Sequence, residues 1–127
     1  MLRSLGPEDV ALIPILINSL HDEKCGGRFW ILIALEDISP YDPVVFASVA
    51  KHSRDPDEHL RGETIRYLGQ YGAAYTDIAV PALARAARLR SAQDFVSNVA
   101  KAFIALVRLA GWKEAWLAMR REKDTGK

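Results

Sequence analysis

Apolar residues recur at spacings of three and four along nearly the whole 127-residue chain. The strict alternation that marks a half-buried strand is not sustained between turn signals. A three-and-four spacing places apolar side chains on one face of an α-helix. The pattern therefore predicts an all-α protein in which short connections join antiparallel neighbours.

Turn-forming residues divide this pattern into seven predicted helices. Pro7 suits the first position of a helix, Pro40 stops a helix before it, and Gly72 suits a left-handed cap at a helix end. The predicted helices run from Pro7 to Leu20, Lys24 to Ile38, Asp42 to Ser53, Asp55 to Gly72, Thr76 to Arg90, Ser91 to Ala110 and Trp112 to Lys123.

The chain also shows an internal period. A shift of 33 residues places Asp22 on Asp55 and Arg28 on Arg61, and a further shift of 39 places Asp55 on Asp94. A repeat of this length is typical of helical hairpins that stack on one another. We expect one domain, residues 1–123, with hairpins at about residues 8–39, 42–72 and 76–111, a cap at 112–123 and a flexible tail at 124–127.

The last predicted helix has its large apolar residues at positions i, i+3, i+4 and i+7, namely Trp112, Ala115, Trp116 and Met119. This stripe is expected to pack over the third hairpin and to close the end of the array. The competing interpretation is a helix on a membrane surface, attracted by the basic residues that follow. A short apolar face makes that interpretation the weaker of the two.

At this point the residues resemble HEAT repeats, whose pattern combines a proline in the first helix, an aspartate in the turn and an arginine at the start of the second helix. The first repeat matches with Pro14, Asp22, Gly27 and Arg28, and the second with Ala47, Asp55, Leu60 and Arg61. The third departs from the pattern, because Asp94 follows Pro81 after only 13 residues and Ala100 replaces the arginine.

The resemblance implies an α-α superhelix of about three HEAT-like hairpins with the second helices on its concave side. It further implies that each aspartate caps a second helix and that each arginine pairs with the aspartate of the next repeat. The expected ladder consists of Asp22, Arg28, Asp55, Arg61 and Asp94.

Charge is distributed unevenly along the chain. Up to Asp77 the sequence has 7 basic and 12 acidic residues, and after it 10 basic and 4 acidic residues. This asymmetry can steer a partner or favour head-to-tail contact between copies, although a solvated helical array also produces such ends by chance. Cys25 is the only cysteine, and we see no signal-type leader or membrane span, so a cytoplasmic protein is expected.

One polar cluster, Asp57 to Glu63, raises the question of a metal or acid/base site. His59 and Glu63 are four residues apart and could share a helix face, but two ligands make at most half a metal site. The segment also resembles the one that carries a His-Glu iron motif in HEAT-repeat deoxyhypusine hydroxylases. Gly62 stands where that histidine would be. We therefore expect no catalytic residue, no metal and no cofactor.

The main alternative function is nucleic-acid binding, since HEAT-like alkylpurine glycosylases bind DNA on a basic concave face. Candidate phosphate contacts here are Arg85, Arg88, Arg90, Lys101 and Arg108. The expected concave positions Ala102, Ala105 and Leu109 are apolar, however. A HEAT-like bilin lyase-type enzyme or chaperone is a further alternative. The favoured hypothesis is a non-enzymatic adaptor, scaffold or regulator that binds another protein on the row of second helices.

A mismatch between repeats suggests where such a partner binds. The 33-residue shift matches Glu63 and Arg66 with Trp30 and Ile33, so two polar positions become large apolar ones. Either the N-terminal residues 1–5 cover the Trp30 ring, or a partner or second copy does. The expected partner-binding residues are Trp30, Ile33, Glu63, Arg66 and Gln70.

Overall fold

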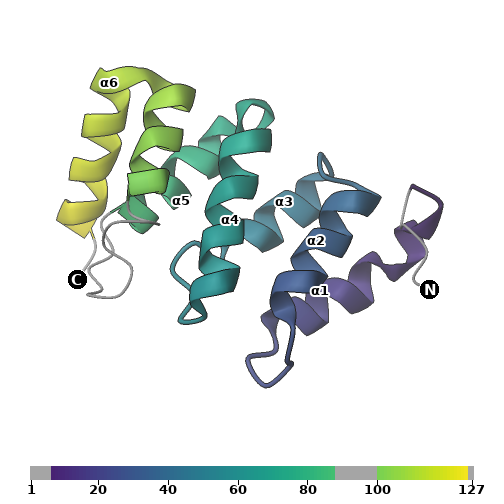
Figure 1. Ribbon diagram of the computed structural model, residues 1–127. Coiled ribbons are helices and arrows are strands. Elements are labelled where there is room, and N and C mark those ends of the chain that lie inside the picture. The colour runs from purple at the N-terminus through teal and green to yellow at the C-terminus, as the bar shows by residue number, and fades with distance from the viewer. Residues whose placement is uncertain (1–6, 88–99, 126–127) are drawn as a thin grey trace.

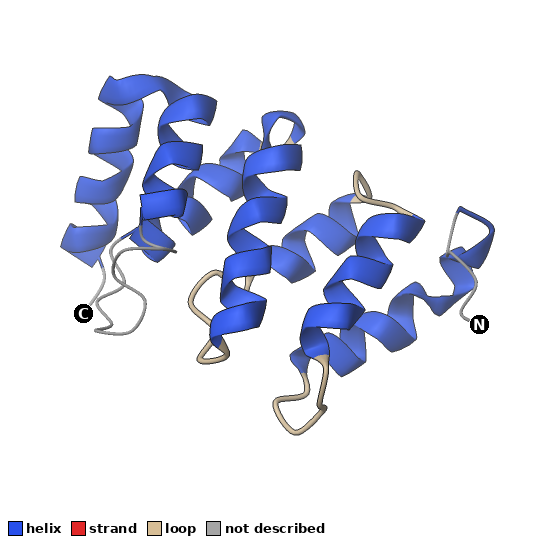
Figure 2. Ribbon diagram, in the orientation of Figure 1, coloured by secondary structure: helices blue, strands red, loops and turns tan. Residues whose placement is uncertain are grey.

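The computed structural model describes residues 7–87 and 100–125, and these residues form helices and short connections without any strand (Figure 2). This result confirms the predicted all-α class. The elements are the 3-10 helix η1 (Pro7–Leu12), α1 (Ile13–His21), α2 (Arg28–Ile38), α3 (Pro43–Ala50), α4 (Glu58–Tyr71), the 3-10 helix η2 (Gly72–Ala74), α5 (Thr76–Ala87) and α6 (Ala100–Thr125).

The helices are arranged in two rows. Helices α1, α3 and α5 form one row and α2, α4 and α6 the other, and each helix also packs on its partner in the opposite row (Figure 1). The apolar side chains between the rows are fully buried, among them Leu20, Leu32, Phe46, Leu68 and Leu83. The chain thus forms three successive hairpins. The superhelical curvature that the HEAT resemblance implies remains a prediction.

Two of the helices are capped at their first turn by an aspartate side chain. The Oδ1 atom of Asp42 accepts hydrogen bonds from the backbone N–H groups of Val44 and Val45, at 2.8 and 3.2 Å. Asp57 caps α4 in the same way, so this helix begins at Glu58 and not at Asp55 as predicted. Asp55 does not cap the helix, because its carboxylate pairs with Arg28 and His52 and accepts a hydrogen bond from the backbone N–H of Asp57.

Three further boundaries differ from the prediction. Helix α2 begins at Arg28 instead of Lys24, because Gly27 before it has a left-handed conformation with φ of 75°. Gly72 has φ of −72°, so it continues into η2 and is not a left-handed cap. The first predicted helix begins with the 3-10 turn η1. The predicted start at Ser91 lies outside the described residues.

Gly111 divides α6 into two arms that run in opposite directions (Figure 1). Its φ of 82° and ψ of 165° are a conformation that side-chain-bearing residues essentially avoid. The sequence predicts a helix boundary here. Of the stripe predicted to pack over the third hairpin, Ala115 is buried, Met119 is half-buried against the core, and the Trp112 ring meets Phe103 of the inner arm edge to face. Trp112 and Trp116 nevertheless remain 70% and 58% exposed, and Ala118 is buried.

Candidate functional site

A cleft of about 770 Å³ lies between α4 and the inner arm of α6. Small residues bring the two helices close together beneath it: a Cβ atom added to Gly69 would lie only 3.0 Å from the Cβ of Ala105. The cleft is lined by Glu58, His59, Gly62, Glu63, Ile65, Arg66, Gly69, Gln70, Lys101, Ile104, Ala105 and Arg108.

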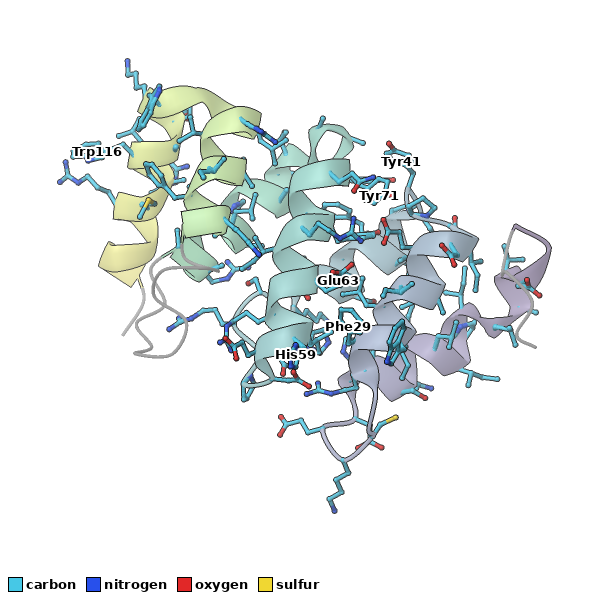
Figure 3. All side chains as sticks on the ribbon, in the orientation of Figure 1. Phe29, Tyr41, His59, Glu63, Tyr71 and Trp116 are labelled. Atoms are coloured by element: carbon cyan, nitrogen blue, oxygen red, sulfur yellow. The ribbon has the colours of Figure 1, made fainter. Side chains whose placement is uncertain are left out.

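Charged side chains lie on both sides of the cleft. Helix α4 provides Glu58, Glu63 and Arg66, and α6 provides Lys101 and Arg108. Ile104, also on α6, is 54% exposed and gives the cleft an apolar contact point. Figure 3 shows His59 near one end of α4 and Glu63 farther along the same helix. This combination of an exposed aliphatic side chain between charged side chains resembles the composition of a binding groove.

Arg66 joins the α4 side of the cleft to α2. Its Nε donates to Glu63 Oε2 at 2.7 Å, its Nη1 donates to Gln70 Oε1 at 2.7 Å, and its Nη2 pairs with Glu36 of α2. The hydrogen bond with Glu63, together with the nearby charge of Glu36, raises the pKa of Arg66 despite its partial burial. The positive charge of Arg66 is thus largely compensated by the two glutamates.

Tyrosines extend this network to the end of the α2–α4 boundary. The Tyr71 hydroxyl donates to Glu36 Oε2 at 2.6 Å, and burial together with this hydrogen bond raises its pKa to about 12. Tyr67 donates to the carbonyl of Pro40 at 2.6 Å. The rings of Tyr41 and Tyr71 meet edge to face with centroids 5.1 Å apart (Figure 3). These contacts fix the position of α4, and with it one side of the cleft.

The structure separates the predicted partner-binding residues into two groups. Glu63, Arg66 and Gln70 lie together on α4 and line the cleft. Trp30 and Ile33 lie on α2 and are absent from the described lining; Ile33 is half-buried, and Trp30 is 68% exposed. The N-terminal residues 1–5, the predicted alternative cover for Trp30, lie outside the described residues.

Among the described residues, the expected ladder shows a buried ion pair between the first and second repeats. Nη1 and Nη2 of Arg28 lie 2.9 Å from the two carboxylate oxygens of Asp55, and Nη1 also donates to the carbonyl of Leu20. Arg61 donates to the backbone carbonyl of Asp55 at 2.5 Å. Asp22 is exposed and accepts from the backbone N–H of Lys24, before α2 begins. Asp94 lies outside the described residues.

Two histidines form a chain of contacts that runs from the buried carboxylate of Asp55 to the surface. His52 is buried with its Nδ1 2.9 Å from Asp55 Oδ2, and its Nε2 lies 2.9 Å from Nδ1 of the exposed His21. Burial alone would raise the pKa of Asp55, but hydrogen bonds from Arg28, the Asp57 backbone and His52 outweigh it and lower this pKa. The pKa of His21 is lowered mainly by burial, and the nearby His52 and Lys51 lower it further.

Sequence reasoning identified the α6 side of the cleft only in part. It named Lys101 and Arg108 only as candidate phosphate contacts and expected Ala102, Ala105 and Leu109 on this face. Ala105 lines the cleft, whereas Ala102 is fully buried and Leu109 is half-buried in the core. The signal that identifies the correct face is the spacing of Lys101, Ile104 and Arg108 at i, i+3 and i+7. These residues follow the polar side of the helix, whereas Ala102 and Leu106 follow its buried side.

Among the described residues, no group of three His, Cys, Asp or Glu side chains could hold a metal ion. Within residues 7–87 and 100–125, no helix combines the length and the apolar character needed to cross a membrane. No protein-family model matches the chain, and no match is found among curated proteins or among solved structures.

Proposed function

We propose that the chain is a non-enzymatic protein-binding module whose site is the cleft between α4 and α6. The observation that carries this proposal is the exposed Ile104 within a cleft that has Glu58 and the Glu63–Arg66 pair on the α4 side and the basic residues Lys101 and Arg108 on the α6 side. The row formed by α2, α4 and α6 contains the cleft, in keeping with a HEAT-like arrangement, in which partners bind along the second helices.

The chemistry of the cleft favours an amphipathic helix of a partner protein. Such a helix can place an apolar side chain on Ile104, basic side chains toward Glu58 and Glu63, and acidic ones toward Lys101 and Arg108. Lys101 and Arg108 have no ion-pair or hydrogen-bond partner among the described residues, so both charges are available to a bound segment. Complementary charges fix the orientation of a partner and exclude incorrect ones.

Two other functions receive less support. Nucleic acid would find Arg66, Lys101 and Arg108 in the cleft, but Arg66 is paired with Glu63 and Glu36, and Glu58 repels phosphate groups. An enzyme with a covalent mechanism needs a nucleophile beside a base. The described lining of the cleft contains no serine, threonine or cysteine, so catalysis through a hydroxyl or thiol nucleophile receives no support.

Site-specific photo-crosslinking in the native host tests the proposal. A photoreactive amino acid at position 104 should capture a discrete protein partner, because this position lies in the cleft. The matched control is the same amino acid at position 44, where Val44 on α3 is 62% exposed in the other row. Charge reversal at Lys101 and Arg108 should abolish the crosslink at position 104.

Three results would contradict the proposal. Equal capture at positions 104 and 44 would show that Ile104 marks no specific surface. Capture that survives charge reversal at Lys101 and Arg108 would remove the charged sides of the cleft from the argument. Tight, salt-sensitive binding of a labelled single-stranded or duplex DNA or RNA, lost in the charge-reversal variant, would favour the nucleic-acid alternative.

A further inference from the structure

The first hairpin leaves large apolar side chains uncovered at one end of the array. Ile15 on α1 is 64% exposed, and Val10 and Leu12 of η1 are also exposed. Trp30 on α2, the second helix of this hairpin, is 68% exposed. We call this surface, formed by Val10, Leu12, Ile15 and Trp30, the α1–α2 end.

The outer arm of α6 leaves a second apolar surface uncovered at the opposite end. Trp112 and Trp116 are separated by one helical turn, and the Arg120 guanidinium lies over the Trp116 ring, 4.9 Å from its centroid. Figure 3 shows Trp116 on the outer side of α6, directed away from the other helices. We call this surface, formed by Trp112, Trp116 and Arg120, the α6 end. Exposed tryptophan beside arginine is the composition of an interface anchor.

The two ends carry opposite charge. Residues 7–39 contain six acidic and two basic residues; Glu36 pairs with Arg66 of α4 and Arg28 is buried in its pair with Asp55, which leaves five acidic residues and Lys24. The outer arm of α6, residues 112–125, contains four basic and three acidic residues. Apolar surfaces of this kind occur at both ends of one array, so the α6 end of one molecule complements the α1–α2 end of another in apolar character and in charge.

We infer that copies of this chain associate head to tail, with the α6 end of one molecule on the α1–α2 end of the next. Two different surfaces form such a contact, so it is heterologous and leaves one free end of each kind on every assembly. The contact is separate from the cleft between α4 and α6, and it stands whether or not the cleft binds a partner.

Variants that block one end at a time test this inference. Ile15→Arg adds a positive charge to the acidic α1–α2 end, with Trp30→Arg as a second variant of the same end. Trp116→Glu adds a negative charge to the basic α6 end. Val44→Arg and Val44→Glu on α3, between the two ends, are the matched controls. Circular dichroism verifies the helical content of each variant, and light scattering coupled to size exclusion measures mass over a concentration range.

The wild-type chain and both Val44 variants should form assemblies whose mass rises with concentration and falls with added salt, since salt screens the charges. At concentrations where the wild-type chain assembles, each end-blocked variant alone should be monomeric. Loss of a central anchor residue should weaken association by about tenfold or more. A mixture of Ile15→Arg with Trp116→Glu should form a two-chain complex and nothing larger, because each partner retains one intact end.

Three outcomes would overturn the inference. A wild-type chain that is monomeric at all concentrations excludes the contact. If blocking one of the two ends leaves assembly intact, the contact is symmetric and uses the other end alone. A monomeric wild type that sediments with vesicles containing anionic phospholipid, when Trp116→Glu does not, assigns the α6 end to a lipid surface instead.

Discussion

Arg28 of α2 and Asp55 of the α3–α4 turn form two parallel hydrogen bonds of 2.9 Å inside the protein, across the boundary between the first and second hairpins. The two residues are 27 positions apart in sequence, and both are buried. Because the pair is buried, it joins neighbouring hairpins through a charged contact that is shielded from water. Two planar groups paired at two points also restrict how one hairpin can rotate against the next.

The first prediction concerns this pair. Arg28→Ala should lower the free energy of unfolding by about 3 to 5 kcal/mol, because it leaves the Asp55 carboxylate buried without its charged partner. Urea denaturation followed by circular dichroism measures the effect. The matched control is Arg54→Ala, since Arg54 is exposed and adjacent to Asp55 in sequence. Equal, small losses in the two variants would show that the ion pair contributes nothing specific.

The second prediction concerns His21 and pH. The pKa of His21 is lowered in the folded protein, so the unfolded chain takes up its proton first as the pH falls below about 6.5. Stability should therefore decrease from neutral pH downward, and this decrease should end below the folded-state pKa. His21→Gln should flatten the dependence of the urea midpoint on pH between about 7 and 5. Parallel curves for the variant and the wild type would contradict this account.

The third prediction uses an unsatisfied hydroxyl. The Thr64 side chain on α4 is completely buried, and its Oγ1 has no hydrogen-bond partner among the residues that the structure describes. Thr64→Val replaces this hydroxyl with a methyl group, so it should raise the free energy of unfolding by about 1 kcal/mol. Thr64→Ser is the comparison, since it retains the hydroxyl but removes the methyl group and should destabilise. Calorimetry distinguishes the two, and a destabilised Thr64→Val would indicate a hydroxyl that is satisfied in solution.

The fourth prediction concerns the closest approach between the second and third hairpins. A Cβ atom on Gly72 would lie 2.8 Å from the Cβ of Ala79 and 2.8 Å from Cδ1 of Leu109. Gly72→Ala should therefore destabilise by about 1 to 3 kcal/mol through overpacking. Gly26→Ala is the control, because nothing lies within 4 Å of a Cβ at that position. A thermal midpoint for Gly72→Ala that equals the control would show that the helices can separate without cost.

Sequence patterns predict the fold class and most of the helices, because these depend on local spacing and on turn residues. Asp42 begins α3 and Gly111 divides α6 as expected. Errors arise where a tertiary contact competes with a local preference. Asp55 looks like the first residue of a helix, but its carboxylate is required by Arg28 and His52, and Asp57 caps α4 instead.

The candidate site was only partly predictable, for a physical reason. Glu63, Arg66 and Gln70 follow from the regular 33-residue period, and they line the cleft together. Lys101 and Arg108 do not follow from it, because the irregular spacing of the third repeat hides which face of α6 is turned toward α4. The outer arm differs from its predicted stripe in a similar way: Ala115 and Ala118 are its buried positions, whereas Trp112 and Trp116, which have the larger apolar area, are exposed.

Each hairpin packs mainly on itself and on the hairpins next to it. This arrangement has a consequence for synthesis, because a hairpin needs only residues that the ribosome has already released, and none from the distant end of the chain. The first hairpin can therefore form while the third is still being translated, and contacts between residues close in sequence favour rapid folding. The buried Arg28 can find its partner only when Asp55 has emerged, so the joint between the first two hairpins is completed in the order in which the chain is made.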